Sequence, residues 1–513
     1  MMRRHPLAKD IATIVLGAAL LILPGLAAVD VFNPDEPREA EIAREMRASG
    51  DLVVPTFNGC PFLEKPPLFY WGVGLAAKLQ FLREEAIVRL PSVLAAISLL
   101  LVTYFLGREL FDRRTGRAGA LLLLTTFQFW WYARRGLLDM TLSAFVGAAI
   151  LFFAMAVRRR AGGMPDHGRT RSAVSIDSGD SGAVRGARWS IGLLALAGAA
   201  AAGAALTKGL IGLVIPAVAA ASWLLWRREL RAVISPSILA AAAVPVLALG
   251  AWIAALAIRP EGACFVREFL IENHVKRFFG GGYGGHEQPF WYYLQALLTD
   301  ELPWVVFLPS AVAGLWPGLR RQIDEGSEAR TEGKGGDGPK LLLAWLLPCL
   351  VFLSISSGKR SLYLLPLGPA IALLVAAWWR TRAPSWRRRA KGPAAGRGGL
   401  AVRLPASALL VLGLVLALAL PVAIGALRTG IDVRRAEDAL VAVRAAPAGV
   451  ALGGVLLAAV LAIQGLDRGR RSSHQCRSRG GARPRVRPPE AINGPDGGRA
   501  SAGLAGSGTA RIM

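Results

Sequence analysis

The stretch 190–226, SIGLLALAGAAAAGAALTKGLIGLVIPAVAAASWLLW, places a single charged residue, Lys208, between two long apolar blocks. An α-helix needs about 17–25 apolar residues to cross the hydrocarbon core of a bilayer, which is the length of these blocks. Only helices and closed barrels satisfy their backbone hydrogen bonds in lipid, and the alternation of a barrel strand is absent here. The stretch therefore predicts two consecutive transmembrane helices.

Long apolar blocks separated by short charged segments recur along the chain, which has 513 residues, 53% of them hydrophobic, and a mean hydropathy of +0.43. We expect twelve spans, at 11–29, 92–107, 118–133, 140–157, 190–206, 209–226, 237–258, 296–316, 341–357, 361–379, 404–427 and 447–466. The first resembles a signal peptide, but its length and the spans that follow favour an uncleaved helix. The predicted fold class is an all-α membrane protein, a polytopic bundle of twelve or thirteen transmembrane helices.

A thirteenth span would be segment 66–82, PPLFYWGVGLAAKLQFL, which is apolar but contains two prolines and Lys78. With twelve spans and a cytoplasmic N-terminus, two thirds of the 60 Lys and Arg residues fall on the cytoplasmic side, in agreement with the positive-inside rule. Counting 66–82 as a span would invert all later loops. We therefore interpret it as a juxtamembrane helix at the outer interface, and we expect both termini in the cytoplasm.

The chain divides into a transmembrane domain, 1–466, and a basic tail, 467–513, rich in Arg, Gly and Pro. The tail and the polar cytoplasmic segments 160–188 and 322–340 contain little that could form a core, so we expect them to be disordered. The net charge of +25 lies in loops and the tail beside apolar blocks, which favours contacts with anionic membrane lipids over nucleic acid. The four cysteines show no CxxC pair, so we expect neither a disulfide scaffold nor a Cys-based zinc site.

Charged residues collect on the predicted outer side of the membrane, above all in the first outer loop, 30–91. Ionisable groups at the ends of spans are costly unless they are solvated or paired, so they are functional candidates. The candidates in the first loop are Asp35, Glu36, Arg38, Glu64 and Lys65. The candidates in the later outer segments are Asp139, Lys208, His274, Arg277, Lys359 and Tyr363.

These residue types suit a substrate with an anionic head and a lipid tail. Lys and Arg would hold a phosphate, while a carboxylate is free to take a proton from an attacking hydroxyl. The sequence contains no Walker A and no GxGxxG loop to bind a nucleotide. A lipid-linked donor is therefore favoured over a nucleotide-activated one, and no nucleotide cofactor is expected.

Several motifs in the same order resemble the bacterial aminoarabinose transferases of lipid A, which belong with the protein O-mannosyltransferases to the C-type glycosyltransferase superfold. The resemblance covers about residues 10–380 and implies an inverting glycosyltransferase whose donor is a polyprenyl-phosphate sugar and whose acceptor is a glycolipid, a protein or another glycan. The matching motifs are NPDEPREAEIAREM (33–46), SGDLVVPTFNG (49–59), FLEKPPLFYW (62–71), EEAIVRLPS (84–92), GLLDM (136–140), LTKGL (206–210), ENHVKRFFGG (272–281), GHEQPFWYY (285–293), LPW (302–304) and SGKRSLYLLPLGPA (357–370).

The resemblance also implies roles for individual residues. Asp35 falls on the acidic residue expected at the catalytic centre, beside Glu36, and Asp139 falls on a second acidic position at the end of a span. Lys65 is implied to hold the phosphate of the carrier lipid, together with Arg277 and Tyr363. Glu64 and His274 fall on positions linked to a divalent metal, zinc in some members.

Two positions depart from the family pattern. Glu39 stands where an aromatic residue usually follows DEPR, which affects the expected substrate contacts around Arg38. The motif GHEQPFWYY has one histidine, His286, where relatives often have two, which weakens the implied metal site. Among the remaining phosphate-binding candidates, Lys208 could bind a phosphate or only cap a short loop, and Lys359 belongs to the loop SGKRSLY.

Other interpretations stay open at this stage. Asp35 could act only as the N-cap of a helix, and Lys65 could only extend its ammonium group to the membrane interface. From another class of function, the chain could be a lipid or solute transporter, although no internal repeat accompanies its spans. The crowding of charges on one face favours the enzyme.

Overall fold

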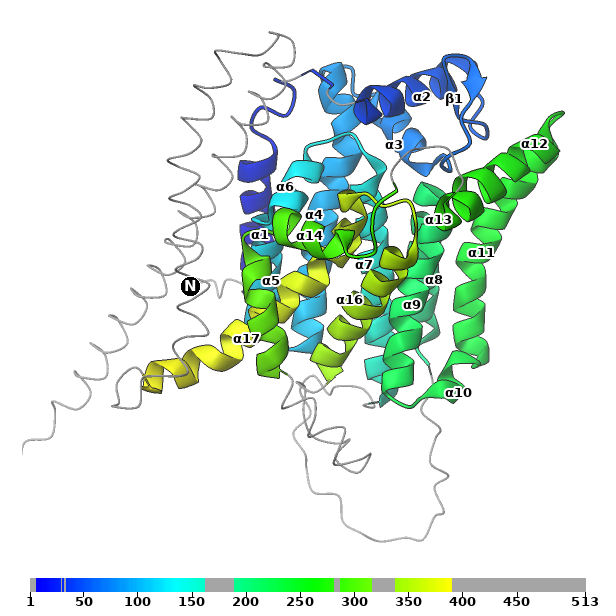
Figure 1. The fold of residues 1–513 in the computed structure, drawn as a ribbon. Helices are drawn as coiled ribbons and strands as arrows, with labels where there is room; N and C mark the ends of the chain where they lie inside the picture. Colours follow the sequence, from blue (N-terminus) through cyan, green and yellow to red (C-terminus); the bar gives the residue numbers. More distant parts are fainter. Residues whose placement is uncertain are drawn as a thin grey trace, which may run out of the picture. The chain divides into compact units, whose positions relative to one another are not determined.

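The computed structural model describes residues 6–28, 30–31, 34–161, 189–280, 287–315 and 337–389. These residues are helical almost throughout, and they contain one two-stranded sheet. Long helices run side by side as a bundle, and the short elements of the first loop cover one end of it (Figure 1). We call this the loop end of the bundle.

Among the described residues, six helices are long and apolar enough to cross a membrane, and one bent pair would make a seventh. The six are α4 (Glu84–Leu110), α7 (Leu138–Ala161), α8 (Ile191–Lys208), α11 (Pro236–Ala257), α16 (Asp337–Ile355) and the continuous pair η4 (Ser361–Leu367) and α17 (Gly368–Arg389). One further apolar helix, α9 (Leu210–Trp226), coincides with the predicted span 209–226, and α1 (Pro6–Ile22) overlaps the first part of the predicted span 11–29. A polytopic helical membrane protein is confirmed. The predicted spans 404–427 and 447–466, and the tail, lie outside the described residues.

The predicted span 118–133 is not one continuous helix. It consists of α5 (Arg113–Leu124) and α6 (Phe127–Ala133), which are separated at Thr125 and Thr126. The hydroxyl of each threonine donates a hydrogen bond to a carbonyl of the preceding turn. Such bonds compete with the helical ladder, and here the helix ends beside them.

The predicted span 296–316 is also interrupted. Its helix α14 (Tyr292–Asp300) and the helical segment Trp304–Leu315 meet at an angle of 111°. Pro303 lies at the break, where it has no N–H to donate and disfavours a helical residue before it. The angle is that of a broken span or a re-entrant loop.

The first loop folds into the small elements that carry its charged residues. Helix α2 begins with two acidic residues, which favour a helix N-terminus, and ends at Gly50 in the left-handed conformation. Its apolar side, with Ile42 and Met46, packs against Phe69 of α3. The elements are α2 (Asp35–Ser49), β1 (Thr56–Phe57), β2 (Cys60–Pro61) and α3 (Leu68–Ala76). With nine residues, about 14 Å, α3 is too short to cross a bilayer, in agreement with its interpretation as a juxtamembrane helix.

The remaining short elements connect the long helices. They are α10 (Leu230–Val233), α12 (Gly262–Arg267), η1 (Glu268–Lys276), α13 (Arg277–Phe279) and η2 (Trp304–Phe307). Small residues let the long helices approach closely, as is common in membranes. A Cβ on Gly116 of α5 would overlap the carbonyl oxygen of Tyr104 of α4.

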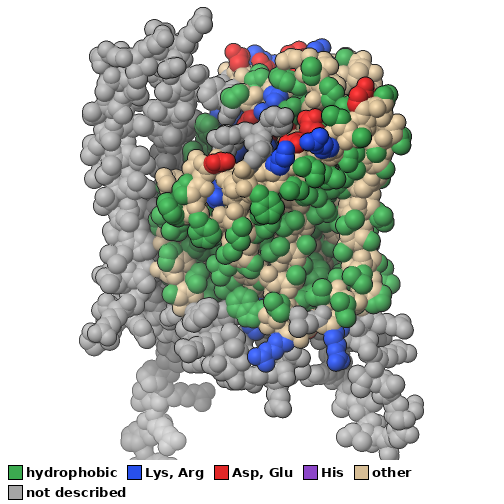
Figure 2. Space-filling view, turned by 45° about the vertical axis from the view of Figure 1, so that its right-hand side comes forward, with side chains coloured by type: hydrophobic (Ala, Val, Ile, Leu, Met, Phe, Trp, Pro, Cys, Tyr) green, Lys and Arg blue, Asp and Glu red, His purple; other side chains and the backbone are tan. Residues whose placement is uncertain are grey.

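Charge is distributed unevenly over the surface. Figure 2 shows Asp, Glu, Lys and Arg side chains gathered at the loop end, a hydrophobic band below them, and Lys and Arg side chains at the opposite end. The band is what lipid tails would contact. The charged side chains at the loop end include those that form the site described next.

Candidate active site

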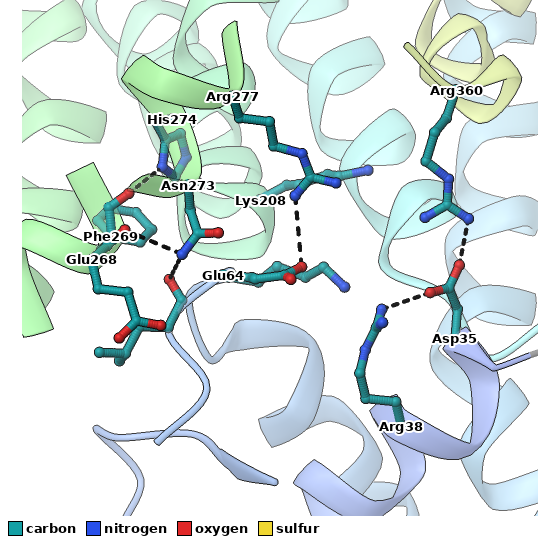
Figure 3. Close-up of polar contacts among 12 residues, drawn as sticks. Asp35, Arg38, Glu64, Lys208, Glu268, Phe269, Asn273, His274, Arg277 and Arg360 are labelled. Carbon is teal, nitrogen blue, oxygen red and sulfur yellow. Dashed lines mark hydrogen bonds and ion pairs between the residues drawn. The ribbon is translucent and has the colours of Figure 1, made fainter. Parts of the chain in front are cut away.

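The first acidic residue of α2, Asp35, lies between two arginines from distant parts of the chain. Its Oδ1 atom is 2.8 Å from Nη2 of Arg38, one turn along the same helix, and its Oδ2 atom accepts a hydrogen bond from Arg360. Arg360 comes from the loop between α16 and η4 (Figure 3). Asp35 thus joins the first loop to the sixth long helix.

A second carboxylate, Glu39, extends this ion-pair chain. It accepts hydrogen bonds from Lys65 and from Arg38, the latter at 3.0 Å, and its Oε2 atom accepts a third from the hydroxyl of Tyr70 at 2.7 Å. The order Arg360, Asp35, Arg38, Glu39, Lys65 therefore alternates cations and carboxylates. Each charge in the chain neutralises its neighbours.

The cations keep both carboxylates ionised. Burial alone would raise the pKa of Asp35, but the hydrogen bond from Arg360 and the charges of Arg360, Arg38 and Lys65 outweigh it, so the pKa is lowered. Burial likewise acts to raise the pKa of Glu39, and Lys65 and Arg38 again reverse the direction. Both side chains are therefore anions at neutral pH.

A second ion pair, between Asp139 of α7 and Lys208 of α8, lies beside this chain. The ammonium of Lys208 donates to Oδ1 of Asp139 and lies 4.6 Å from the centre of the Tyr363 ring. The carboxylate of Asp139 also interacts electrostatically with Arg360. The structure thus brings the second predicted acid and two predicted phosphate-binding residues next to Asp35.

Arg277, at the start of α13, approaches from the other side. Its Nη1 atom is 3.7 Å from Oε2 of Glu64 (Figure 3), and the charge of Glu64 also acts on Arg38. Arg277 is 27% exposed at its side chain, so it can reach a bound anion. Arg38, Lys65, Arg277 and Arg360 therefore surround one small region at the loop end.

The side chains of Glu36 and Lys359 are engaged by partners outside this ion-pair chain. Glu36 is fully buried, accepts bonds from Arg89 at 2.7 and 3.0 Å, and accepts another from the backbone N–H of Gly136 at 2.8 Å. These contacts tie α2 to α4 and to the loop before α7. Lys359 is 4% exposed and donates to the carbonyl of Gln288 at 2.7 Å. Their contacts support structural roles, and the predicted functional roles stay predictions.

The implied zinc pair, Glu64 and His274, does not fit a metal site in this arrangement. Nδ1 of His274 is 2.7 Å from the carbonyl oxygen of Phe269, and its Nε2 atom accepts a bond from the N–H of Leu210 at 3.3 Å. Both ring nitrogens are thus engaged by the backbone, and Glu64 faces Arg277. Within the part of the chain that the structure describes, no three His, Cys, Asp or Glu side chains gather closely enough to hold a metal.

Four residues of the region were not among the predicted site residues. Arg360 lies in the motif SGKRSLY, which also contains the predicted residues Lys359 and Tyr363. The motif indicates the position of Arg360, but not that it pairs with Asp35. Tyr70 and Glu39 meet through the packing of α3 on α2, which no short motif indicates. Phe62 is the ring beneath two of the cations, 5.3 Å from Arg38 and 5.8 Å from Lys65.

Residues 64–163 match the model of a protein family described as dolichyl-phosphate-mannose-protein mannosyltransferase. The chain is also similar to curated transferases named undecaprenyl phosphate-α-4-amino-4-deoxy-L-arabinose arabinosyl transferase. That of Sodalis glossinidius is 31% identical over 364 residues, which is 70% of this chain and 57% of the relative. That of Pectobacterium atrosepticum is 30% identical over 382 residues, 74% of this chain and 61% of the relative. The chain thus spans less than two thirds of the length of these relatives.

Solved structures support the same fold. The crystal structure of ArnT from Cupriavidus metallidurans bound to undecaprenyl phosphate matches with a TM-score of 0.57 at 22% identity, covering 87% of this chain and 75% of that one. The apo form of the oligosaccharyltransferase of Archaeoglobus fulgidus matches with a TM-score of 0.51 at 13% identity, covering 88% and 56%. These structures show the shared fold, and the curated relatives confirm the resemblance carried by the sequence motifs.

Proposed function

From its relationship to the aminoarabinose transferases and the protein mannosyltransferases, we propose that this chain is an integral-membrane, inverting glycosyltransferase. It moves a sugar from a polyprenyl-phosphate carrier to an acceptor on the periplasmic face of a bacterial inner membrane. The family favours a lipid A-like glycolipid as the acceptor, and a protein or another glycan are the alternatives. The donor requires no nucleotide cofactor.

One observation carries this proposal: four cations and the carboxylate of Asp35 surround one region at the end of an apolar bundle. A polyprenyl-phosphate sugar has an anionic head next to a long apolar tail. The hydrophobic band of the bundle suits the tail, and Arg38, Lys65, Arg277 and Arg360 suit the phosphate. A soluble substrate would need no such junction between the band and the charged end.

The reaction we propose is an in-line displacement at the anomeric carbon of the sugar. The acceptor oxygen forms a bond to that carbon, while the bond between the carbon and the phosphate oxygen breaks and polyprenyl phosphate leaves. Lys65 and Arg277 stabilise the charge that develops on the leaving phosphate, with Arg38 and Arg360 close by. The residues thus act mainly by positioning the reactants and by electrostatics.

The role of Asp35 depends on the acceptor. A hydroxyl acceptor must lose a proton, and the ionised carboxylate of Asp35 can accept it. A phosphate acceptor, as on lipid A, is already an anion and needs no base. In that case Asp35 orients Arg38 and Arg360, the two side chains that it binds. Asp139 would hold Lys208 in the same way.

The membrane topology belongs to the same proposal. Twelve spans, or thirteen, place both termini in the cytoplasm and the first loop in the periplasm. The Lys and Arg side chains at the end opposite the loops support this orientation (Figure 2). Polyprenyl-phosphate donors would then reach the site from the outer leaflet.

Comparison of lipid extracts from a strain that lacks the protein with extracts from its parent tests the function. Mass spectrometry should find a glycosyl group missing from a lipid A-like glycolipid, and complementation with the wild-type chain should restore it. Loss of a glycosyl group from protein or from another glycan would instead name that acceptor. An unchanged set of glycosylated molecules would contradict the transferase.

A further inference from the structure

One carboxylate inside the proposed phosphate site has no part in the displacement itself. Glu39 is 0% exposed, and its two oxygens bind Lys65, Arg38 and Tyr70. Lys65 is the residue proposed to stabilise the leaving phosphate. Its ammonium group already donates a hydrogen bond to the fixed carboxylate of Glu39. A carboxylate buried at this place weakens the attraction of the site for any phosphate.

We propose that Glu39 is a specificity-determining residue that makes the site distinguish lipid phosphates by their charge. It lets the site hold the mono-anionic sugar donor and release the di-anionic polyprenyl phosphate. The inference rests on the proposed function, since it concerns the phosphate site of the same donor. It goes beyond that function in assigning control of product release to one buried side chain.

The chemistry of the transfer changes the charge of the phosphate. In the donor the phosphate is a diester of lipid and sugar, with one negative charge. Breaking its bond to the sugar leaves a monoester, whose second ionisation has a pKa of about 6, so it carries nearly two charges at neutral pH. A site with only cations would therefore bind the product more tightly than the donor.

The charges around Glu39 set the size of this effect. Arg38, Lys65, Arg277 and Arg360 are paired with Asp35, Glu39 and Glu64, which leaves one excess positive charge. Without the charge of Glu39 the excess would be two. Coulomb energy scales with the product of the charges, so Glu39 repels a di-anion with twice the energy with which it repels a mono-anion. Because Glu39 is buried, salt screens this repulsion little.

Binding of two lipids to the purified full-length protein tests the proposal: a short-chain polyprenyl phosphate and its methyl diester, which mimics the charge of the donor. At pH 7.5, Glu39→Gln should tighten binding of the diester about threefold and of the monoester about tenfold. At pH 5 the monoester also carries a single charge, so Glu39→Gln should increase the affinity for the two lipids by the same factor. The proposal would be overturned if Glu39→Gln increased the two affinities by the same factor at pH 7.5 as well, or if it increased neither affinity.

Two further variants separate charge from shape. Glu39→Asp keeps the charge and should keep the wild-type ratio of the two affinities. Glu41→Gln makes the same change on the same helix, at a partly exposed carboxylate that accepts hydrogen bonds from Arg44, and should change neither affinity. A rise in monoester selectivity in either variant would contradict a role specific to the charge at position 39.

The wild-type protein also tests the proposal if Glu39→Gln does not fold. Its affinity for polyprenyl phosphate should change less than about threefold between pH 5 and pH 7.5, although the lipid gains a charge over this range. A rise of tenfold or more would overturn the proposal. Failure of the proposed function itself would look different, because the wild type would then bind neither lipid.

Discussion

At the scale of single residues, a substitution at Asp35 distinguishes an enzyme from a transporter. Asp35→Asn keeps the size of the side chain and removes its charge and its ability to accept a proton. We expect transfer to a hydroxyl acceptor to fall by about a hundredfold or more, the usual contribution of a general base. Rates on purified protein measure this, with Asp30→Asn, a change at an exposed aspartate, as the matched control. A transporter would tolerate Asp35→Asn. The alternative that Asp35 only caps α2 does not fit, because Pro34 is the N-cap residue and no side chain caps this helix.

The pH dependence of Asp35 follows from its ion pairs. Because Arg360 and Arg38 lower its pKa in the folded protein, the stabilising contribution of Asp35 is fully present above the ordinary Asp pKa of 3.8. It is lost as the pH falls through the lowered value. Transfer should therefore show no acidic limb from Asp35 between pH 5 and pH 8. A limb in this range that disappears in Asp35→Asn would show that burial, and not the arginines, dominates.

Lys65 is the residue-scale test of the phosphate site. Lys65→Ala removes a charge-assisted contact worth about 1.5–3 kcal/mol, so donor affinity should fall about tenfold or more. Lys65→Arg should restore it only in part, because a planar guanidinium replaces a compact ammonium group. Lys65→Ala should also lower the thermal unfolding temperature, since the buried Glu39 loses a partner. Donor affinity equal to that of the wild type in Lys65→Ala would remove this residue from the site.

At the scale of elements, His274 links η1 to the beginning of α9. Its Nε2 atom accepts the N–H of Leu210, and its ring lies 4.5 Å from that of Phe269. Burial lowers the pKa of His274, so the ring is neutral at neutral pH. His274→Ala should lower the free energy of unfolding by about 1–3 kcal/mol without changing the metal content of the purified protein. Loss of one equivalent of zinc in the variant would restore the metal interpretation.

At the scale of the whole molecule, the orientation in the membrane decides where the chemistry takes place. Cys60 and Cys264 are free and exposed, in the first loop and in α12. A membrane-impermeant thiol reagent applied to intact cells should label single-cysteine variants that keep either residue, and should spare one that keeps only Cys476 of the tail. Labelling of Cys476 with protection of Cys60 would invert the topology and move the site to the cytoplasm.

The sequence by itself determined the class of the molecule and the motifs of its site. Apolar length decides whether a segment can cross a bilayer, so blocks such as 190–206 and 209–226 indicate helices without knowledge of any contact. The charged segments that interrupt them identify the loops, and short local motifs carry Asp35 and Lys65. Hydrophobicity and local motifs are properties of neighbouring residues, which a sequence displays directly.

Only the tertiary structure decided which charges meet. Asp35 and Arg360 are brought together by the packing of the first loop on the last described helices, and Glu36 is bound to Arg89 on a different helix from its own. The same packing placed Glu39 on Lys65 and turned both nitrogens of His274 toward the backbone. An ion pair depends on distance and burial in space, and residues far apart in a sequence acquire both only when the helices pack.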